Sequence, residues 1–310
     1  MRKQILNKIE QYEIITIFGH IRPDGDCLGS QIALRNIIED NYKKEAFAVG
    51  ENSEQLNFLG KTNIVEDDII QKSLAIIVDT ANKKRISDAR YKGAKEIIRI
   101  DHHHVGSENY GDINLQENSS SCCEIIASMA IENNLTIKEK AATALYTGIV
   151  TDTGGFCHKG TNENTLEIAS KLIKYGANPS EINKNMSKKT FNKLFLKGYV
   201  INNVKKTEKG FVYCYLSIST IEKYEVSQEE ASDTLEVLSN IENCPVWALF
   251  IEDKEGIRIR IRSNGPRIDF LANKYEGGGH QLASGARIKD LKEIDNFARD
   301  VDKVIEEYEK

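Results

Sequence analysis

The chain has 310 residues, which is enough for about two domains of ordinary size. Hydrophobic residues make up 40% of it and charged residues 29%, the balance of a soluble globular protein. The sequence contains neither a run of roughly 20 apolar residues nor the apolar core of a signal peptide. We therefore expect a cytoplasmic protein that does not span a membrane and whose six cysteines stay reduced. The net charge of −5 argues against a protein that coats long nucleic acids.

The first half of the chain alternates short apolar runs with segments of helical periodicity. The runs at 14–18, 46–49, 74–78 and 97–100 are typical of buried strands, and apolar residues recur at helical spacing within 28–38 and 125–130. This alternation predicts an α/β fold with a doubly wound, mainly parallel sheet. In such sheets ligands bind at the carboxyl ends of the strands.

The last third of the chain predicts a smaller α+β domain. Strands are expected at 211–218, 246–251 and 257–261, followed by a closing helix at 291–307. The segment 182–207 holds seven lysines and no acidic residue, and we interpret it as a connection with a helix at 191–200. The predicted domains are therefore 1–183 and 205–310, joined by a helical linker at 184–204, with the active site in the cleft between them.

Acidic and histidine residues gather in four loops of the first half. The loops are 19–26, 78–82, 101–104 and 150–156, and three of them follow predicted strands. Taken singly the signals are weak, because Pro-Asp-Gly-Asp at 23–26 is also a good turn sequence and an aspartate after a strand is often a capping residue. Together they offer two imidazoles and four carboxylates: His20, Asp24, Asp26, Asp79, His102 and Asp152.

This set suits two divalent cations that share one bridging carboxylate. Mixed aspartate and histidine ligation without a thiolate favours Mn²⁺, or Mg²⁺ or Fe²⁺, over a structural zinc. Two such ions about 3.5–4 Å apart suit in-line attack on phosphorus.

Two features of the second half indicate anion binding. The stretch 256–263 alternates isoleucine with arginine, so a strand there would place Arg258, Arg260 and Arg262 on one face. Guanidinium groups bind phosphate well, although the same pattern also fits a solvated sheet face. Three glycines at 277–279 precede His280 and allow backbone N–H groups to approach an anion, although such a run is also a common flexible turn.

These motifs, taken in order, resemble the DHH phosphoesterase superfamily and its NrnA-type nanoRNase and pAp-phosphatase branch. The run Asp101-His102-His103 matches the motif that names the superfamily, and the other three loops match its remaining N-terminal motifs. Gly277–Gly285 matches the glycine-rich motif of its DHH-associated C-terminal domain. The resemblance covers nearly the whole chain.

The resemblance implies a role for each matching residue. One metal ion would be held by His20, Asp24 and Asp79, and the other by Asp26, Asp79, His102 and Asp152, with Asp79 as the bridge. His103 would face the scissile phosphate, where it would stabilise developing charge or assist the leaving oxygen. Asp101 would orient a neighbouring imidazole. Substrate contacts are expected from the second domain, at Arg262, Ser263, Gly278, Gly279 and His280. His104 and His158 match no role and are interpreted as polar residues near the mouth of the site.

The implied function is hydrolysis of short RNA or DNA oligonucleotides to nucleoside 5′-monophosphates, together with dephosphorylation of pAp. Three alternatives stay open: a phosphodiesterase of cyclic dinucleotides such as c-di-AMP or of linear pApA, an inorganic pyrophosphatase or polyphosphatase, and a non-catalytic nucleotide-binding module. A complete ligand set argues against the last, and the glycine-rich motif against the pyrophosphatase. The sequence leaves the oligomeric state open, a homodimer included.

Overall fold

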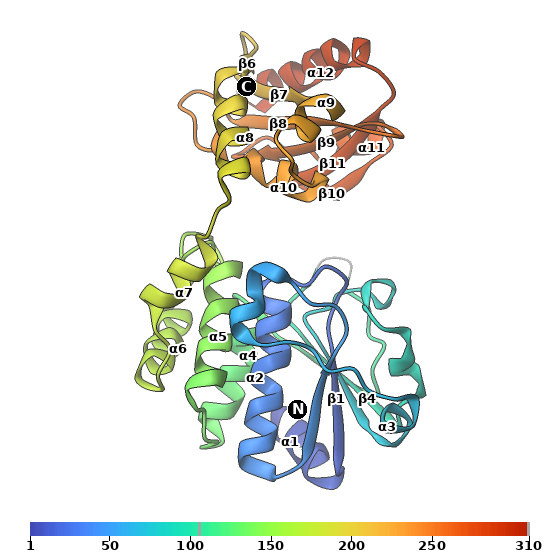
Figure 1. Ribbon diagram of the computed structural model, residues 1–310, viewed down its shortest axis with the longest axis vertical. Coiled ribbons are helices and arrows are strands. Elements are labelled where there is room, and N and C mark those ends of the chain that lie inside the picture. Colours follow the sequence, from blue (N-terminus) through green and yellow to red (C-terminus); the bar gives the residue numbers. More distant parts are fainter. Residues whose placement is uncertain (105–106, 309–310) are drawn as a thin grey trace. The chain divides into compact units, whose positions relative to one another are not determined.

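The computed structural model describes residues 1–104 and 107–308, which divide into two compact units at 1–188 and 189–310 (Figure 1). The first unit contains a five-stranded sheet in the order β2-β1-β3-β4-β5, in which every described pairing is parallel. Its strands are β1 (Ile14–Phe18), β2 (Glu45–Val49), β3 (Leu74–Val78), β4 (Glu96–Asp101) and β5 (Ile113–Gln116). The parallel sheet expected from the sequence is confirmed.

Helices cover both faces of this sheet, which explains why its strands are nearly continuous apolar runs. The α-helices are α1 (Arg2–Gln11), α2 (Gly25–Tyr42), α3 (Asp67–Lys72), α4 (Cys122–Glu132), α5 (Glu139–Asp152), α6 (Glu163–Lys174) and α7 (Pro179–Met186). Short 3₁₀ helices are η1 (Glu54–Leu59), η2 (Lys83–Arg85) and η3 (Ala89–Gly93). Alternate residues of β3 enter opposite cores: Ile76 packs with α1, α2, α4 and α5, whereas Ile77 packs with α3.

The second unit contains a mixed six-stranded sheet in the order β10-β11-β9-β8-β7-β6. Its strands are β6 (Lys205–Lys206), β7 (Phe211–Leu216), β8 (Val246–Asp253), β9 (Gly256–Ser263), β10 (Gly278–His280) and β11 (Ala283–Ile288). Its helices are α8 (Phe191–Asn202), α9 (Ile218–Lys223), α10 (Gln228–Asp233), η4 (Thr234–Leu238), α11 (Asp269–Lys274) and α12 (Lys292–Tyr308). The smaller α+β domain expected from the sequence is confirmed.

Helix α8 belongs to the core of the second unit. It falls in the segment 184–204 that the sequence suggested as a linker, but it buries Leu196 and Val200 against β7 and β8. Lys193 and Lys197 of the same helix form ion pairs with Asp233 and Glu236. Two lysines of the basic segment therefore form ion pairs within the second unit.

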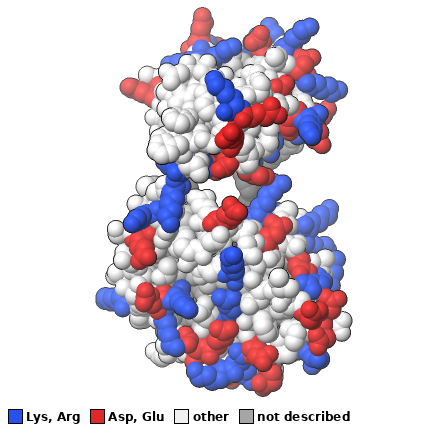
Figure 2. Space-filling model, in the orientation of Figure 1, with Lys and Arg blue, Asp and Glu red and all other residues white. Residues whose placement is uncertain are grey.

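The surface carries mixed charge. On the face that Figure 2 shows, basic and acidic side chains are interspersed over each unit. No helix among residues 1–104 and 107–308 is long and apolar enough to cross a membrane.

Candidate metal centre

The predicted metal ligands gather at the carboxyl end of the parallel sheet. In the strand order 2-1-3-4-5 the chain leaves β1 and β3 in opposite directions, which opens a crevice between their ends. His20 follows β1, Asp79 follows β3 and His102 follows β4. Asp26 comes from the first turn of α2, and Asp152 is the last residue of α5. The fold thus brings together side chains up to 132 positions apart.

The first turn of α2 sends Asp24 and Asp26 in different directions. Asp24 is the N-cap, and its Oδ1 accepts hydrogen bonds from the N–H groups of Asp26 (3.1 Å) and Cys27 (3.0 Å). Its Oδ2 then lies 3.7 Å from Nε2 of His20. Since the ring Nδ1 of His20 lies 2.9 Å from the carbonyl of Ile21, it donates there, and Nε2 keeps its lone pair for a metal.

Asp26 is fully buried and is held by the N-terminus of α4. Its two oxygens accept hydrogen bonds from the N–H groups of Cys122 (2.7 Å) and Cys123 (2.8 Å), which are otherwise unpaired in the first turn of that helix. Its Oδ2 also lies 3.9 Å from Nε2 of His102. The carboxylate is therefore fixed in place while one side still faces the ligand cluster.

Asp79 occupies the middle of the cluster. Its backbone has a left-handed φ of 48°, which is strained for a non-glycine residue and turns the side chain into the crevice. Oδ2 lies 3.4 Å from Nε2 of His20, while Oδ1 lies 3.4 Å from Nε2 of His102. Oδ1 is buried and has no hydrogen-bond partner among the described residues. A buried carboxylate oxygen without a hydrogen-bond partner is suited to bind a cation on the His102 side of Asp79.

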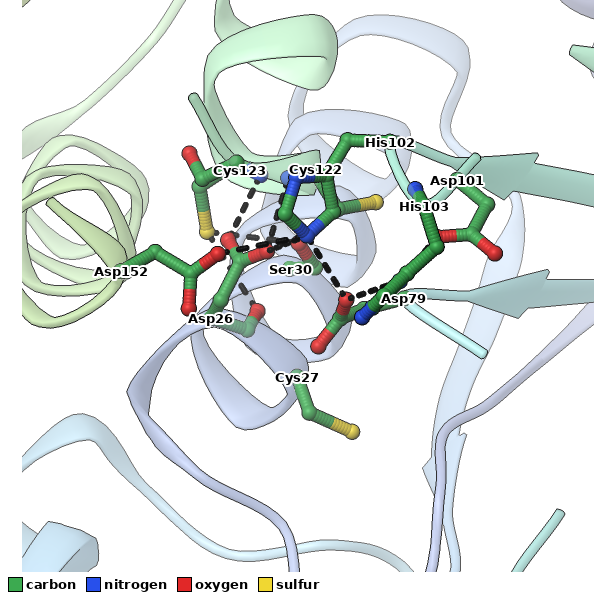
Figure 3. A network of polar contacts seen from close by, with 12 residues as sticks. Asp26, Cys27, Ser30, Asp79, Asp101, His102, His103, Cys122, Cys123 and Asp152 are labelled. Carbon is green, nitrogen blue, oxygen red and sulfur yellow. Dashed lines mark hydrogen bonds and ion pairs between the residues drawn. The ribbon is translucent and has the colours of Figure 1, made fainter. Parts of the chain in front are cut away.

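His102 points between three carboxylates (Figure 3). Its Nε2 lies 3.2 Å from Oδ2 of Asp152, in addition to the contacts with Asp26 and Asp79. Its Nδ1 is 3.3 Å from the carbonyl of Ser119, which again leaves Nε2 as the atom available to a metal. His158 is exposed, and its Nδ1 lies 3.0 Å from the backbone oxygen of Asp152, so it braces the end of α5.

The electrostatics of the cluster indicate a shortage of positive charge. Burial, and then the charge of Asp79, raises the pKa of Asp26 to about 7. Burial, and then the charges of Asp26 and Asp79, raises the pKa of Asp152 to about 8. Burial acts to lower the pKa of His102, but the surrounding carboxylates outweigh it and raise that pKa to about 10. Each raised pKa means that the side chain holds its proton more tightly, and a divalent cation could take the place of these protons. The donor set therefore fits a metal centre.

Asp101 and His103 lie directly beside these residues, and Nδ1 of His103 is 3.5 Å from Oδ1 of Asp79. Oδ1 of Asp101 accepts hydrogen bonds from the backbone N–H of His103 (3.1 Å) and from its Nδ1 (2.7 Å). The other oxygen of Asp101 pairs with the fully buried guanidinium of Arg99. Burial acts to raise the pKa of Asp101, but the hydrogen bonds and charges of His103 and Arg99 lower it. An ionised Asp101 therefore holds the ring of His103 in one orientation.

Sequence reasoning missed two residues of this site. Arg99 interrupts a buried apolar strand, a pattern that indicates a buried ion pair. Cys27 follows Asp24 by three residues, the spacing of neighbours on one helical face. The sequence interpretation assumed a site without sulfur, but atoms of His20, Cys27 and Asp79 lie within 4.8 Å of one another in a grouping that could hold a metal ion. Burial raises the pKa of the Cys27 thiol to about 11.

The residues predicted to bind substrate lie on β9 and β10, the two strands that flank β11 in the second unit's sheet. Arg262 of β9 pairs with Ala283 of β11, which in turn pairs with His280 of β10. Ser263 ends β9, and its buried hydroxyl has no partner among the described residues. Gly278 and Gly279 form β10, and Gly279 has a positive φ of 144°. A Cβ on Gly279 would lie 2.7 Å from the carbonyl oxygen of Ala283, so close packing of the hairpin already requires glycine there.

The arginine face of β9 is not an open platform. Its isoleucines are buried and its arginines share the opposite face, as predicted, but α10 covers that face at Arg258. Arg258 donates to the carbonyl of Gln228 (3.2 Å) and to Oγ of Ser232 (2.9 Å). Arg260 and Arg262 instead line a cavity of about 330 Å³ with Trp247. The anion-binding interpretation is therefore confined to these two arginines.

Comparison with known proteins identifies the family. Residues 14–149 match the DHH family, N-terminal domain, and residues 208–307 match the DHHA1 domain. The bifunctional oligoribonuclease and PAP phosphatase NrnA of Bacillus subtilis is 37% identical, and the alignment covers 100% of each chain. The chain belongs to the NrnA-type branch of the DHH phosphoesterases. It is therefore a hydrolase that acts on phosphoester bonds.

Other relatives agree with this assignment. The protein of the same name from Mycoplasma genitalium is 36% identical over 97% of each chain. The solved structure of an exopolyphosphatase-related protein from Bacteroides fragilis superposes with a TM-score of 0.89 over 99% of this chain and 96% of that one. Its sequence identity is 24%, so this likeness supports the DHH phosphoesterase fold and not a substrate.

The geometry of Asp79 predicts that both halves of the metal centre fail together when it is removed. Asp79→Ala should weaken Mn²⁺ binding by more than the roughly 10- to 100-fold typical of residues that only support ligands. Turnover should be lost, while the circular dichroism spectrum and melting temperature are retained. Calorimetric titration with Mn²⁺ measures the affinity. Asp68→Ala, which removes an exposed carboxylate paired with Lys72, is the control. Wild-type metal affinity in Asp79→Ala would remove the bridging assignment.

Proposed function

We propose that this chain hydrolyses short oligoribonucleotides to nucleoside 5′-monophosphates and removes a phosphate from pAp, with two divalent cations as cofactors. The position of Asp79 carries the metal part of the proposal, because its two oxygens face His20 on one side and His102 on the other. Full-length relatives named for oligoribonuclease and PAP phosphatase activity support the substrate part. The proposal includes a cytoplasmic location and Mn²⁺ as the first choice of ion, with Mg²⁺ and Fe²⁺ as alternatives.

Six side chains would hold the two ions in this proposal. His20, Asp24 and Asp79 would bind the first, and Asp26, Asp79, His102 and Asp152 the second. When bound, such ions neutralise phosphate oxygens and activate water for in-line attack. The protein keeps the ligands in place through backbone hydrogen bonds: Asp24 caps α2, Asp26 is held at α4, and carbonyl groups fix both imidazoles.

His103 is the proposed acid that protonates the leaving oxygen. Its Nδ1–H is committed to Asp101, and its Nε2 has no hydrogen bond among the described residues. The ring is more than one-third exposed, so Nε2 can reach a substrate. A proton held at Nε2 passes to the leaving oxygen as the phosphorus–oxygen bond breaks, and the ionised Asp101 stabilises the imidazolium beforehand.

The second unit would bind the substrate's remaining phosphate. Burial, and then the charge of Arg260, lowers the pKa of Arg262, so its cation lacks neutralisation. The acids that line the same cavity, Asp233 and Glu236, already pair with lysines of α8. A phosphate bound at Arg262 in this cavity would supply the missing negative charge. Ser263, Gly278, Gly279 and His280 remain proposed substrate contacts, but none of them lines this cavity.

The two adjacent histidines should give different defects. His103→Gln should lower kcat by about 10²- to 10⁴-fold, because it removes the acid, with Mn²⁺ affinity unchanged. His102→Gln should weaken Mn²⁺ binding directly. Parallel kinetics and calorimetry separate the two effects, and His104→Gln, an exposed neighbour, is the control. If His103→Gln loses Mn²⁺ affinity and His102→Gln does not, the roles are reversed.

Arg262 should act on substrate binding. Arg262→Ala should raise KM for oligonucleotides by about 10- to 100-fold, the value of one hydrogen-bonded charge, with a smaller change in kcat. Arg267→Ala is a matched control, since Arg267 is exposed and paired with Asp269. An unchanged KM in Arg262→Ala would exclude a role in substrate binding.

One substrate panel tests the function. The purified chain with Mn²⁺ is given an RNA dinucleotide, pAp, pApA, c-di-AMP and pyrophosphate in separate reactions, and kcat/KM is compared. The proposal expects the RNA dinucleotide and pAp to be the best substrates. Faster turnover of c-di-AMP or pApA would favour the cyclic-dinucleotide alternative. Faster turnover of pyrophosphate, or no turnover at all, would contradict the proposal.

A further inference from the structure

The side chain of Cys27 lies among the ligands proposed for the first metal ion. It is fully buried in the first turn of α2, and its sulfur accepts a hydrogen bond from the backbone N–H of His20 at 3.2 Å. Figure 3 shows it on the Asp79 side of the cluster. Atoms of His20, Cys27 and Asp79 lie within 4.8 Å of one another, and all three residues are buried. An ion bound at about 2.0–2.3 Å from each atom requires the three atoms to lie within about 4.6 Å of one another.

The other buried cysteines of this region are arranged differently. The thiol of Cys122 donates to the carbonyl of Ile100 (3.3 Å), and that of Cys123 contacts the carbonyl of Asp26 (3.5 Å) and the hydroxyl of Ser30 (3.3 Å). Both sulfurs are committed to protein oxygens. The sulfur of Cys27 instead accepts an N–H, an interaction that stabilises a sulfur atom carrying negative charge.

Nitrogen, sulfur and carboxylate oxygen together form a different donor set from the other half of the centre. Asp26, His102 and Asp152 offer oxygen and nitrogen only. Hard cations such as Mn²⁺ prefer oxygen and nitrogen, whereas thiolate favours softer ions such as Zn²⁺ and Co²⁺. The two halves therefore differ in the ions that they should prefer.

We infer that Cys27 is a sulfur ligand for soft or borderline divalent cations at the His20–Asp79 half of the metal centre. The inference rests on the proposed metal centre and adds a selectivity that oxygen and nitrogen ligands alone do not provide. When Zn²⁺ or Co²⁺ binds, the metal–sulfur bond forms and the thiol proton leaves to water. Mn²⁺ is held by His20, Asp24 and Asp79 without the sulfur.

Cobalt spectroscopy tests this inference without relying on activity. Metal-free, full-length protein is titrated with Co²⁺ under reducing conditions, and its absorption spectrum is recorded. Visible ligand-field bands report a bound ion, and a near-ultraviolet charge-transfer band reports a cobalt–sulfur bond. Wild type should develop both. Cys27→Ser should keep the visible bands and lose the charge-transfer band, with Co²⁺ affinity at least about tenfold lower and Mn²⁺ affinity unchanged.

Substitutions of two other cysteines serve as controls, and a second substitution of Cys27 supports the test. Cys123→Ser, a nearby buried cysteine, and Cys157→Ser, the exposed cysteine, should both keep the charge-transfer band. Cys27→Ala should behave like Cys27→Ser, which covers the case in which one of them does not fold by circular dichroism.

The outcomes separate this inference from the function on which it rests. Two results would exclude Cys27 as a sulfur ligand without contradicting the metal centre. One is a charge-transfer band that persists in both Cys27 variants, and the other is visible bands without a charge-transfer band in wild type. The absence of any cobalt band in wild type, together with no Mn²⁺ binding by calorimetry, overturns the metal centre as well.

Discussion

The first unit depends on one electrostatic constraint: several carboxylates must share a buried crevice at the carboxyl end of a parallel sheet. Asp26 and Asp79 are almost fully buried, and together with Asp152 they surround a single imidazole. Unscreened negative charges at such distances repel strongly in a low-dielectric interior. Burial, together with this repulsion, raises the pKa values of Asp26 and Asp152. Divalent cations relieve this repulsion, so the fold and the function that we propose share one requirement.

Backbone hydrogen bonds hold the ligands in place against that repulsion. N–H groups at the N-terminus of α4 donate hydrogen bonds to Asp26, and those in the first turn of α2 donate to Asp24. The strained backbone of Asp79 orients its carboxylate toward the crevice. Carbonyl groups orient both ligand imidazoles through their Nδ1 atoms. Since these groups belong to the main chain at helix ends and strand ends, they order the candidate ligands without an ion, which would lower the entropic cost of binding one.

The buried pair of Arg99 and Asp101 gives the adjacent residues His102 and His103 different surroundings. Asp101 lies close enough to Asp79, His102 and His103 to join a metal cluster. Arg99 occupies one of its oxygens and His103 occupies the other, so Asp101 serves the ring of His103 instead. Removing one partner of such a pair would leave a buried charge uncompensated, which costs several kcal/mol. The burial of this charged pair is consistent with a site that needs the ring of His103 in one orientation.

The sequence by itself determined the fold class and predicted the histidines and aspartates that gather in the candidate site. Continuous apolar runs predicted β1, β3 and β4 to within one residue at each end, because strands buried on both faces leave little room for polar residues. The strict alternation of β9 likewise predicted its buried isoleucines. The positions of His20, Asp79 and His102, close behind predicted strands, indicated them as candidate ligands. Polar side chains that follow buried parallel strands meet at one edge of a sheet.

Only the tertiary structure decided what each side chain contacts. Which of the two histidines contacts Asp26 and Asp152 and which contacts Asp101 depends on the direction of the chain after β4, which spacing does not specify. The arginine row of β9 reads as an open platform until α10 is seen to cover Arg258. Cys27 resembles an ordinary buried helix residue until the turn of α2 places its sulfur beside His20 and Asp79. Local patterns fix which residues are buried, but contacts between distant segments depend on how helices and loops pack over the sheet, and that packing is a property of the whole fold.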